Sequence, residues 1–173
     1  ERSAFLHVAD LMSSVNAKHA DPETSPQPAV PIEKQVFEGQ SMLVQVMKDP
    51  MGTKGARLSA QISIAGRLLV FLPQDQHIGV SQKIPFEQRE ALRQRLQALA
   101  EAAVQDGKTG NQTGGFILRT NGEDALDTEL AEDIAYLRKT WTRIKEASLR
   151  LPPASVLHQD LTLLQRVLRD LVG

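Results

Sequence analysis

Residues 58–72 read LSAQISIAGRLLVFL, and this stretch decides the class of fold. Its first part, residues 58–64, alternates apolar and polar side chains with a period of two, which is typical of a strand with one solvent-exposed face. Its second part, residues 68–72, is wholly apolar and is followed by Pro73, which cannot donate a hydrogen bond to a sheet. The stretch therefore predicts two successive β-strands, separated at Gly66.

The residues that follow change to the helical period. Between residues 86 and 104 apolar side chains recur at steps of four, three and four, which places them on one helix face: Leu92, Leu96, Leu99 and Ala103. Asp106-Gly107 supplies a stop signal, and a glycine-rich passage at 107–115 leads to a strand expected at 116–119. A second helix is expected from the spacing of Leu130, Ile134, Leu137, Trp141 and Ile144. A third should begin at Asp160 as its N-cap and end near Gly173.

The residues that precede the stretch are expected to form a smaller β region. Residues 42–47 are typical of a buried strand followed by a turn at 49–52, and residues 4–8 of a short strand. Between them, residues 13–31 are rich in Ser and Pro, and we expect a long mobile loop there.

The composition limits the classes of protein to which the chain can belong. Its 173 residues suffice for one ordinary domain or two small ones, and with 4% aromatic residues the core must be mainly aliphatic. The net charge of −1 requires any surface for nucleic acid to be a local patch. The absence of Cys excludes a disulfide framework and a cysteine zinc site, and it suits a cytoplasmic location. No apolar run approaches the roughly 20 residues needed to cross a bilayer.

Two stretches carry binding chemistry. Residues 48–57 place Lys48, Lys54 and Arg57 around a turn between strands, where they could contact a phosphate backbone; an ordinary solvated loop is the alternative. Arg119 and Thr120 end a strand, and their donors could hold a terminal phosphate; an ion pair between Arg119 and a helix carboxylate such as Glu123 is the alternative.

Signals for catalysis are weaker. The four histidines (His7, His19, His77 and His158) are far apart in the sequence, so no histidine metal site is expected. The acidic cluster Glu123, Asp124 and Asp127 could imitate a metal site, but it also suits the start of a helix, where anions are favoured. The sequence holds no phosphate-binding loop of the Walker type and no nucleophile elbow, so we predict no catalytic residue and no metal ligand in it.

Several segments, in order along the chain, resemble the ribonuclease E/G family of bacterial endoribonucleases, on its ribonuclease G side. They are residues 48–58 (KDPMGTKGARL), 69–71 (LVF), 79–84 (GVSQKI), 114–120 (GGFILRT), 135–141 (AYLRKTW) and 165–170 (QRVLRD). The resemblance implies a β-barrel of the OB-like S-one type plus an α+β domain that senses the 5′ end of RNA, followed by a ribonuclease-H-like region. The expected boundaries are residues 1–60, 61–159 and 160–173, with the barrel lacking its first strands because the chain is part of a longer enzyme.

The resemblance also implies roles for particular residues. Phe5, Lys48 and Lys54 match RNA-binding positions of the barrel, and a second set matches the pocket for a 5′-monophosphate: Gly66, Val70, Arg119 and Thr120. At Gly66 the missing Cβ would let a backbone N–H approach the phosphate.

The implied function is RNA binding and 5′-monophosphate sensing in a single-strand-specific endoribonuclease of rRNA processing and mRNA decay. Such an enzyme is a homo-oligomer in the cytoplasm, and its magnesium binds outside this segment. The alternatives are a non-enzymatic OB-fold RNA-binding protein and a domain that binds only protein.

Overall fold

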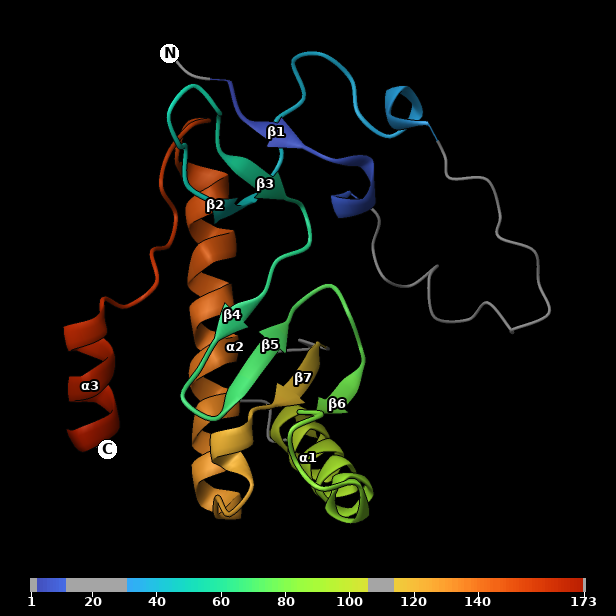
Figure 1. The fold of residues 1–173 in the computed structure, drawn as a ribbon, viewed down its shortest axis with the longest axis vertical. Coiled ribbons are helices and arrows are strands. Elements are labelled where there is room, and N and C mark those ends of the chain that lie inside the picture. Colours follow the sequence, from blue (N-terminus) through green and yellow to red (C-terminus); the bar gives the residue numbers. More distant parts are fainter. Residues whose placement is uncertain (1–2, 12–30, 106–113, 173) are drawn as a thin grey trace. The chain divides into compact units, whose positions relative to one another are not determined.

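The computed structural model describes residues 3–11, 31–105 and 114–172 of the chain (Figure 1). These residues belong to two compact units, Glu1–Ser63 and Ile64–Gly173. The predicted loop at 13–31, except for its last residue, and the predicted helix stop at Asp106-Gly107 lie outside the described residues.

The first unit contains a three-stranded sheet in the order β1-β3-β2, formed by Phe5–Leu6, Arg57–Ser59 and Gln45–Lys48. Strand β1 is parallel to β3, and β2 is antiparallel to it. Short 3-10 turns at Val8–Asp10 (η1) and Ile32–Lys34 (η3) lie between β1 and β2 in the sequence. The strand predicted at 4–8 is shorter than expected because His7 caps the turn that follows, its Nδ1 accepting from the Ala9 N–H at 3.2 Å.

The alternating stretch 58–64 is not one strand, contrary to the prediction. Strand β3 ends at Ser59, whose hydroxyl oxygen accepts a hydrogen bond from the Gln61 N–H at 3.1 Å. At Ser63 the backbone bonds to a side chain instead of a neighbouring strand: Gln45 accepts from its N–H at 2.8 Å and donates to its carbonyl at 3.0 Å. The next strand, β4 (Ile64–Ala65), therefore begins a different sheet.

The second unit is built on a four-stranded sheet in the order β4-β5-β7-β6, which adds Leu69–Leu72 (β5), Ile78–Val80 (β6) and Gly115–Leu118 (β7) to β4. Only β6 and β7 are parallel. Helix α1 (Phe86–Gln105) contacts β6, β7 and helix α2 (Asp127–Arg150), and α2 contacts β4 and β5. Both helices lie where the sequence predicted them. Strand β6 was not predicted, because three residues with a central glycine carry no alternation.

The last helix, α3 (Leu163–Val172), begins later than predicted. Thr162 and Gln165 form a capping box, in which the Thr162 hydroxyl accepts from the Gln165 N–H at 3.4 Å and the Gln165 side chain accepts from the Thr162 N–H at 2.9 Å. Thr162, and not Asp160, is therefore the N-cap.

The core of the second unit lies between its sheet and helices α1 and α2. Its fully buried members are largely aliphatic, with one aromatic pair, Phe71 and Phe116, whose ring centroids are 4.9 Å apart on paired strands. The mixed α and β content predicted for the chain is thus confirmed. In the described part of the chain both sheets are open, and the S-one barrel stays a prediction. None of the described helices combines the length and apolar character that a membrane span requires.

Candidate functional site

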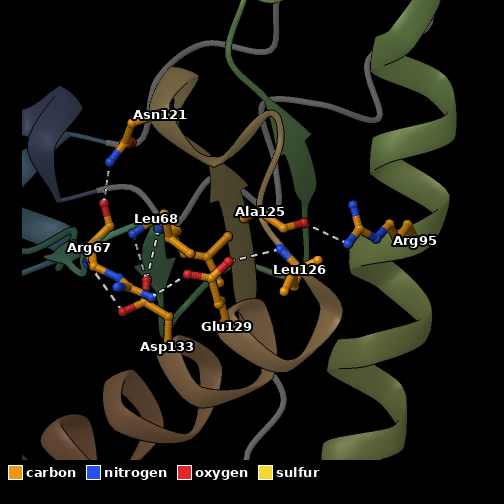
Figure 2. Close-up of polar contacts among 9 residues, drawn as sticks. Arg67, Leu68, Arg95, Asn121, Ala125, Leu126, Glu129 and Asp133 are labelled. Atoms are coloured by element: carbon orange, nitrogen blue, oxygen red, sulfur yellow. Dashed lines mark hydrogen bonds and ion pairs between the residues drawn. The ribbon is translucent and has the colours of Figure 1, made fainter. Parts of the chain in front are cut away.

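The candidate site is built around the turn between β4 and β5, residues 66–69 (Figure 2). The turn is closed by the Gly66 N–H, which donates to the Leu69 carbonyl at 2.8 Å. Its other N–H groups point to the carboxylate of Asp133 on α2, which accepts from Arg67 at 3.1 Å and from Leu68 and Leu69 at 2.9 Å each. Asp133 is only 8% exposed, so an internal anion holds the turn.

Gly66 is needed for this contact. A Cβ at that position would lie 2.5 and 2.7 Å from the two carboxylate oxygens of Asp133, closer than atoms can approach. We expected the missing Cβ to admit a phosphate, whereas in the structure the space it leaves is filled by Asp133. Asp133 was not predicted as a site residue, although its position is unusual for a carboxylate. It lies three residues after Leu130 and four before Leu137, within the apolar stripe of its helix.

The carbonyls of the same turn are bound by the segment after β7. The Arg119 N–H donates to the Leu68 carbonyl at 2.9 Å, and Nη1 of Arg119 donates to the carbonyls of Gly66 at 2.9 Å and Arg67 at 3.2 Å. Asn121 donates to the Arg67 carbonyl at 2.9 Å. The partners of the Arg119 guanidinium are thus backbone carbonyls and not Glu123, the alternative partner that the sequence suggested.

A pocket of about 150 Å³ opens beside the turn, within the second unit. Its lining contains four arginines and one carboxylate: Arg67, Arg119, Arg166, Arg169 and Asp160. Arg67 pairs with Glu129 at 3.1 Å, and His158, also in the lining, lies 3.8 Å from Asp160. Arg119 and Arg166 donate instead to backbone carbonyls, so cationic charge exceeds anionic charge in the lining.

Two of the four predicted sensor residues line this pocket, and two lie outside its lining. Gly66 and Arg119 line the pocket and contact each other. Val70 is half-buried in β5, opposite Ala65 and Ile117, and the Thr120 hydroxyl lies 3.0 Å from that of Ser81. Neither lines the pocket, although Val70 follows the lining residues 64–67 and Thr120 lies between the lining residues Arg119 and Asn121.

The first unit places its predicted residues on one sheet. Phe5, Arg57 and Lys48 are register partners across β1, β3 and β2, with a register shift in β2 just before Lys48. Because directly opposed residues present their side chains on the same face, the exposed ring of Phe5 shares one face of the sheet with two cations, and Arg57 is the nearer of them. Lys54 lies in the connecting turn, where its N–H donates to the Met51 carbonyl at 3.0 Å. Arg57, which the sequence had placed with Lys48 and Lys54 around this turn, also pairs with Asp10 at 3.2 Å.

The glycine of this turn also has a structural reason. A Cβ on Gly55 would overlap the Ser3 carbonyl oxygen and lie 3.3 Å from the Phe5 ring, so only glycine lets β1 approach. The motif at 48–58 therefore contributes a glycine that lets β1 approach, in addition to the cations on the surface.

The acidic cluster supplies no metal site in the described structure. Asp127 lies in the first turn of α2 and forms an ion pair with Arg95, and Glu129 accepts from the Leu126 N–H at 3.0 Å to cap the same helix. Among the described residues there is no group of three His, Asp or Glu side chains that could hold a metal ion. Asp127 and Glu129 therefore act here at the start of a helix, as the sequence suggested for Asp127.

Comparison with known proteins gives the family. The family model described as Ribonuclease E/G family matches residues 63–173. The chain is 40% identical to Ribonuclease G of Haemophilus influenzae over all of its residues and to Ribonuclease G of Escherichia coli over 98% of them, and 34% identical to Ribonuclease E of a Nostoc species over its full length. It spans 33% of each Ribonuclease G and 23% of the Ribonuclease E. The chain therefore belongs to the ribonuclease E/G family.

Proposed function

We propose that this chain is the RNA-binding and 5′-end-sensing part of an endoribonuclease that cuts single-stranded RNA. In this proposal the pocket at Arg119 receives a 5′-monophosphate, and the sheet of the first unit binds the strand. Cleavage, participation in rRNA processing and mRNA decay, homo-oligomer formation and a cytoplasmic location belong to the same proposal, as properties of the whole enzyme.

The observation that carries the proposal is the excess of arginine in the pocket beside residues 66–69. Arg119 and Arg166 donate hydrogen bonds to backbone carbonyls, and neither has a carboxylate partner among the described ion pairs. A terminal monophosphate carries more charge and more acceptor oxygens than an internal phosphodiester, so planar guanidinium groups favour it. At about 150 Å³ the pocket suits a phosphate group and not a whole nucleotide.

The turn is also prepared to keep its shape. Asp133 holds its N–H groups and Arg119 and Asn121 hold its carbonyls, so Arg119 is fixed before any ligand arrives. A preorganised donor loses less conformational entropy on binding. The phosphate is therefore recognised by side chains around the turn, with the turn's own N–H groups already occupied.

The first unit supports RNA binding in a second way. Phe5 is 61% exposed and pairs with Arg57, which in turn pairs with Lys48 across the sheet, and this combines a stacking surface with cations. This combination binds single strands without reading their sequence. The family implies a magnesium ion, but the described residues contain no group of three His, Asp or Glu side chains that could bind it. The proposal therefore gives these residues no role in metal chemistry.

The proposal is tested by binding two RNAs of the same sequence, one with a 5′-monophosphate and one with a 5′-hydroxyl, to the 173-residue chain. We expect Arg119→Ala to weaken binding of the monophosphorylated RNA by roughly 10- to 100-fold, since it removes one or more charged hydrogen bonds. Binding of the 5′-hydroxyl RNA should stay nearly unchanged.

Lys54→Ala is the matched control, because it removes a cation from the first unit. It should weaken both RNAs alike and lower the slope of log affinity against log salt by roughly 0.7. Equal affinity of the unaltered chain for the two RNAs would instead favour a general RNA-binding protein. Equal loss on both RNAs in Arg119→Ala would make Arg119 a structural residue.

A further inference from the structure

A surface at the start of helix α1 combines an aromatic ring with cations. Phe86, the first residue of α1, is 78% exposed, and the guanidinium of Arg89 lies over its ring, with the guanidinium carbon 6.0 Å from the ring centroid. Lys83 is also exposed and lies three residues before Phe86, in the segment between β6 and α1. These three residues, Lys83, Phe86 and Arg89, are called the Phe86 patch below.

Arg89 is held in place by the segment that precedes the helix. Its Nε donates to the Ile84 carbonyl at 2.7 Å, and its Nη2 donates to the Gln82 carbonyl at 2.6 Å. The Ile84 side chain is fully buried, which anchors this segment to the core. The guanidinium is therefore fixed beside the ring before any ligand arrives, and a preorganised group loses less conformational entropy on binding.

The carboxylates near the patch leave its positive charge in place. Glu90 pairs with Arg93 at 2.7 Å, and the hydrogen bond from Arg93 lowers the pKa of Glu90 to about 2. Glu87 directly follows Phe86, and consecutive residues of a helix point to different faces, whereas residues three apart, such as Phe86 and Arg89, share one. None of the described ion pairs involves a cation of the patch. Two cations thus accompany one exposed ring.

This combination suits a single-stranded nucleic acid better than a protein partner. A base can stack on an aromatic ring while the cations beside it attract the phosphates. A docking surface for a protein is expected to be a contiguous apolar patch. The exposed residues between 82 and 90 are instead polar or charged, apart from Pro85 and Phe86. The chemistry of the patch therefore favours RNA.

The segment that leads to the patch is bonded to the residues on both sides of Arg119. The Ser81 N–H donates to the Leu118 carbonyl at 2.9 Å, and the hydroxyl groups of Ser81 and Thr120 lie 3.0 Å apart. The Lys83 N–H donates in turn to the Ser81 hydroxyl at 3.3 Å. The patch thus continues from the segment that carries the proposed sensor residues.

We propose that the Phe86 patch is a further binding surface for single-stranded RNA. One base stacks on the face of Phe86 away from Arg89, and Lys83 and Arg89 contact phosphates. The proposed function assigns strand binding to the first unit and only the 5′-phosphate to the second, so this surface goes beyond it and rests on it only in taking RNA as the ligand. Binding here requires neither a 5′-phosphate nor a particular sequence, because every base has a face that can stack.

The test uses the 173-residue chain and two probes of equal length. One is a short uridine oligomer with a 5′-hydroxyl, and the other is the corresponding abasic oligomer, which has the phosphates without the bases. Backbone amide NMR signals of Gln82 and Gln88 report binding at the patch, and those of Gly66 and Asn121 report binding at the sensor pocket. We expect the uridine oligomer to shift the patch signals saturably, and the abasic oligomer to bind there roughly 5- to 100-fold more weakly. Equal affinity of the two probes at the patch, or no saturable shift there, would overturn the proposal.

Variants of Phe86 separate stacking from apolar contact, and its exposure means that they should fold. Phe86→Leu keeps an apolar side chain without an aromatic face, so it should bind the uridine oligomer roughly 5- to 100-fold more weakly and the abasic oligomer as before. Phe86→Tyr keeps the ring and should bind both like the unaltered chain. Phe37→Leu is the matched control, because it makes the same change at a 73% exposed ring of the first unit, and it should leave the patch unaffected. Unchanged affinity in Phe86→Leu would contradict the proposal.

Lys83→Ala tests the electrostatic part. It should lower the slope of log affinity against log salt, measured at the patch signals, by roughly 0.7, because one phosphate contact is lost. Lys139→Ala removes an exposed cation from α2 and should leave that slope unchanged. A slope that Lys83→Ala does not change would also overturn the proposal. Both probes lack a 5′-phosphate, so a failure at the patch leaves the sensor proposal standing, and the sensor can fail while the patch still binds.

Discussion

Asp133 and Arg138 are buried charges five positions apart on helix α2, and they differ in how the chain treats them. The carboxylate of Asp133 accepts three backbone N–H bonds from residues 67–69, whereas the guanidinium of Arg138 has two N–H groups without a hydrogen-bond partner in the described structure. A charge that the chain satisfies completely stabilises the fold. A charge that it satisfies only in part costs stability. Removing the two charges should therefore have opposite effects on the free energy of unfolding.

The largest effect should follow from removing the satisfied charge. Asp133→Ala leaves three N–H groups of the turn without acceptors in a buried place, and we expect the free energy of unfolding to fall by about 3–5 kcal/mol. Urea denaturation measures this change. Asp133→Asn keeps the shape and one acceptor oxygen and should cost less. A loss below about 1 kcal/mol in the alanine variant would mean that water replaces the carboxylate, and the contrast with Arg138 would disappear.

A smaller effect should come from the glycine that admits this carboxylate. In Gly66→Ala the new Cβ would lie 2.5 Å from an oxygen of Asp133, so helix or turn must shift, at a cost of about 1–3 kcal/mol. The cost should shrink when the same change is made in the Asp133→Ala background, because the oxygen is gone. A double-mutant cycle of unfolding free energies measures the coupling. Full additivity would show that Gly66 is required for a reason other than Asp133.

The smallest and opposite effect is expected at Arg138. Replacement by Met keeps an apolar side chain of similar reach against Phe116 and removes an incompletely paired buried charge, so the free energy of unfolding should rise by about 1 kcal/mol. Thermal and urea unfolding of the two proteins give the value. A fall of several kcal/mol would mean that the charge of Arg138 stabilises the fold, as the charge of Asp133 does. The contacts of Arg138 with the Ala100 carbonyl and the Phe116 ring would then suffice to hold it.

Much of the second unit could be predicted because its elements follow a single local rule. The apolar run at 68–72 and the three- and four-residue spacing in α1 and α2 depend only on neighbours along the chain. The residues of the candidate pocket were predicted only in part. Arg119 and Gly66 came from the resemblance, whereas Asp133, Arg166 and Asn121 were not named as site residues: Asp133 and Arg166 lie on two other helices, and Asn121 lies just after the matched segment 114–120.

The failures have one physical cause, which is competition from side chains for backbone groups. The stretch 58–64 has the right period for a strand, but Gln45 takes the backbone groups of Ser63 and the strand breaks. Asp160 is a good N-cap residue, but Thr162 with Gln165 forms the better cap. Local preference sets what each segment can form, and these partners decided where it stops.

By itself the sequence determined the family, the helices α1 and α2 and the apolar strand within 68–72, because hydrophobic spacing and short motifs are local properties of the chain. Only the tertiary structure decided which buried charges have a full set of hydrogen-bond partners within the described residues. Asp133 and Arg138 lie on the same helix and look equally out of place in its apolar stripe. The turn at 66–69 brings three donors to the first, whereas two buried donors of the second have no partner in the described structure, and burial makes that difference worth several kcal/mol.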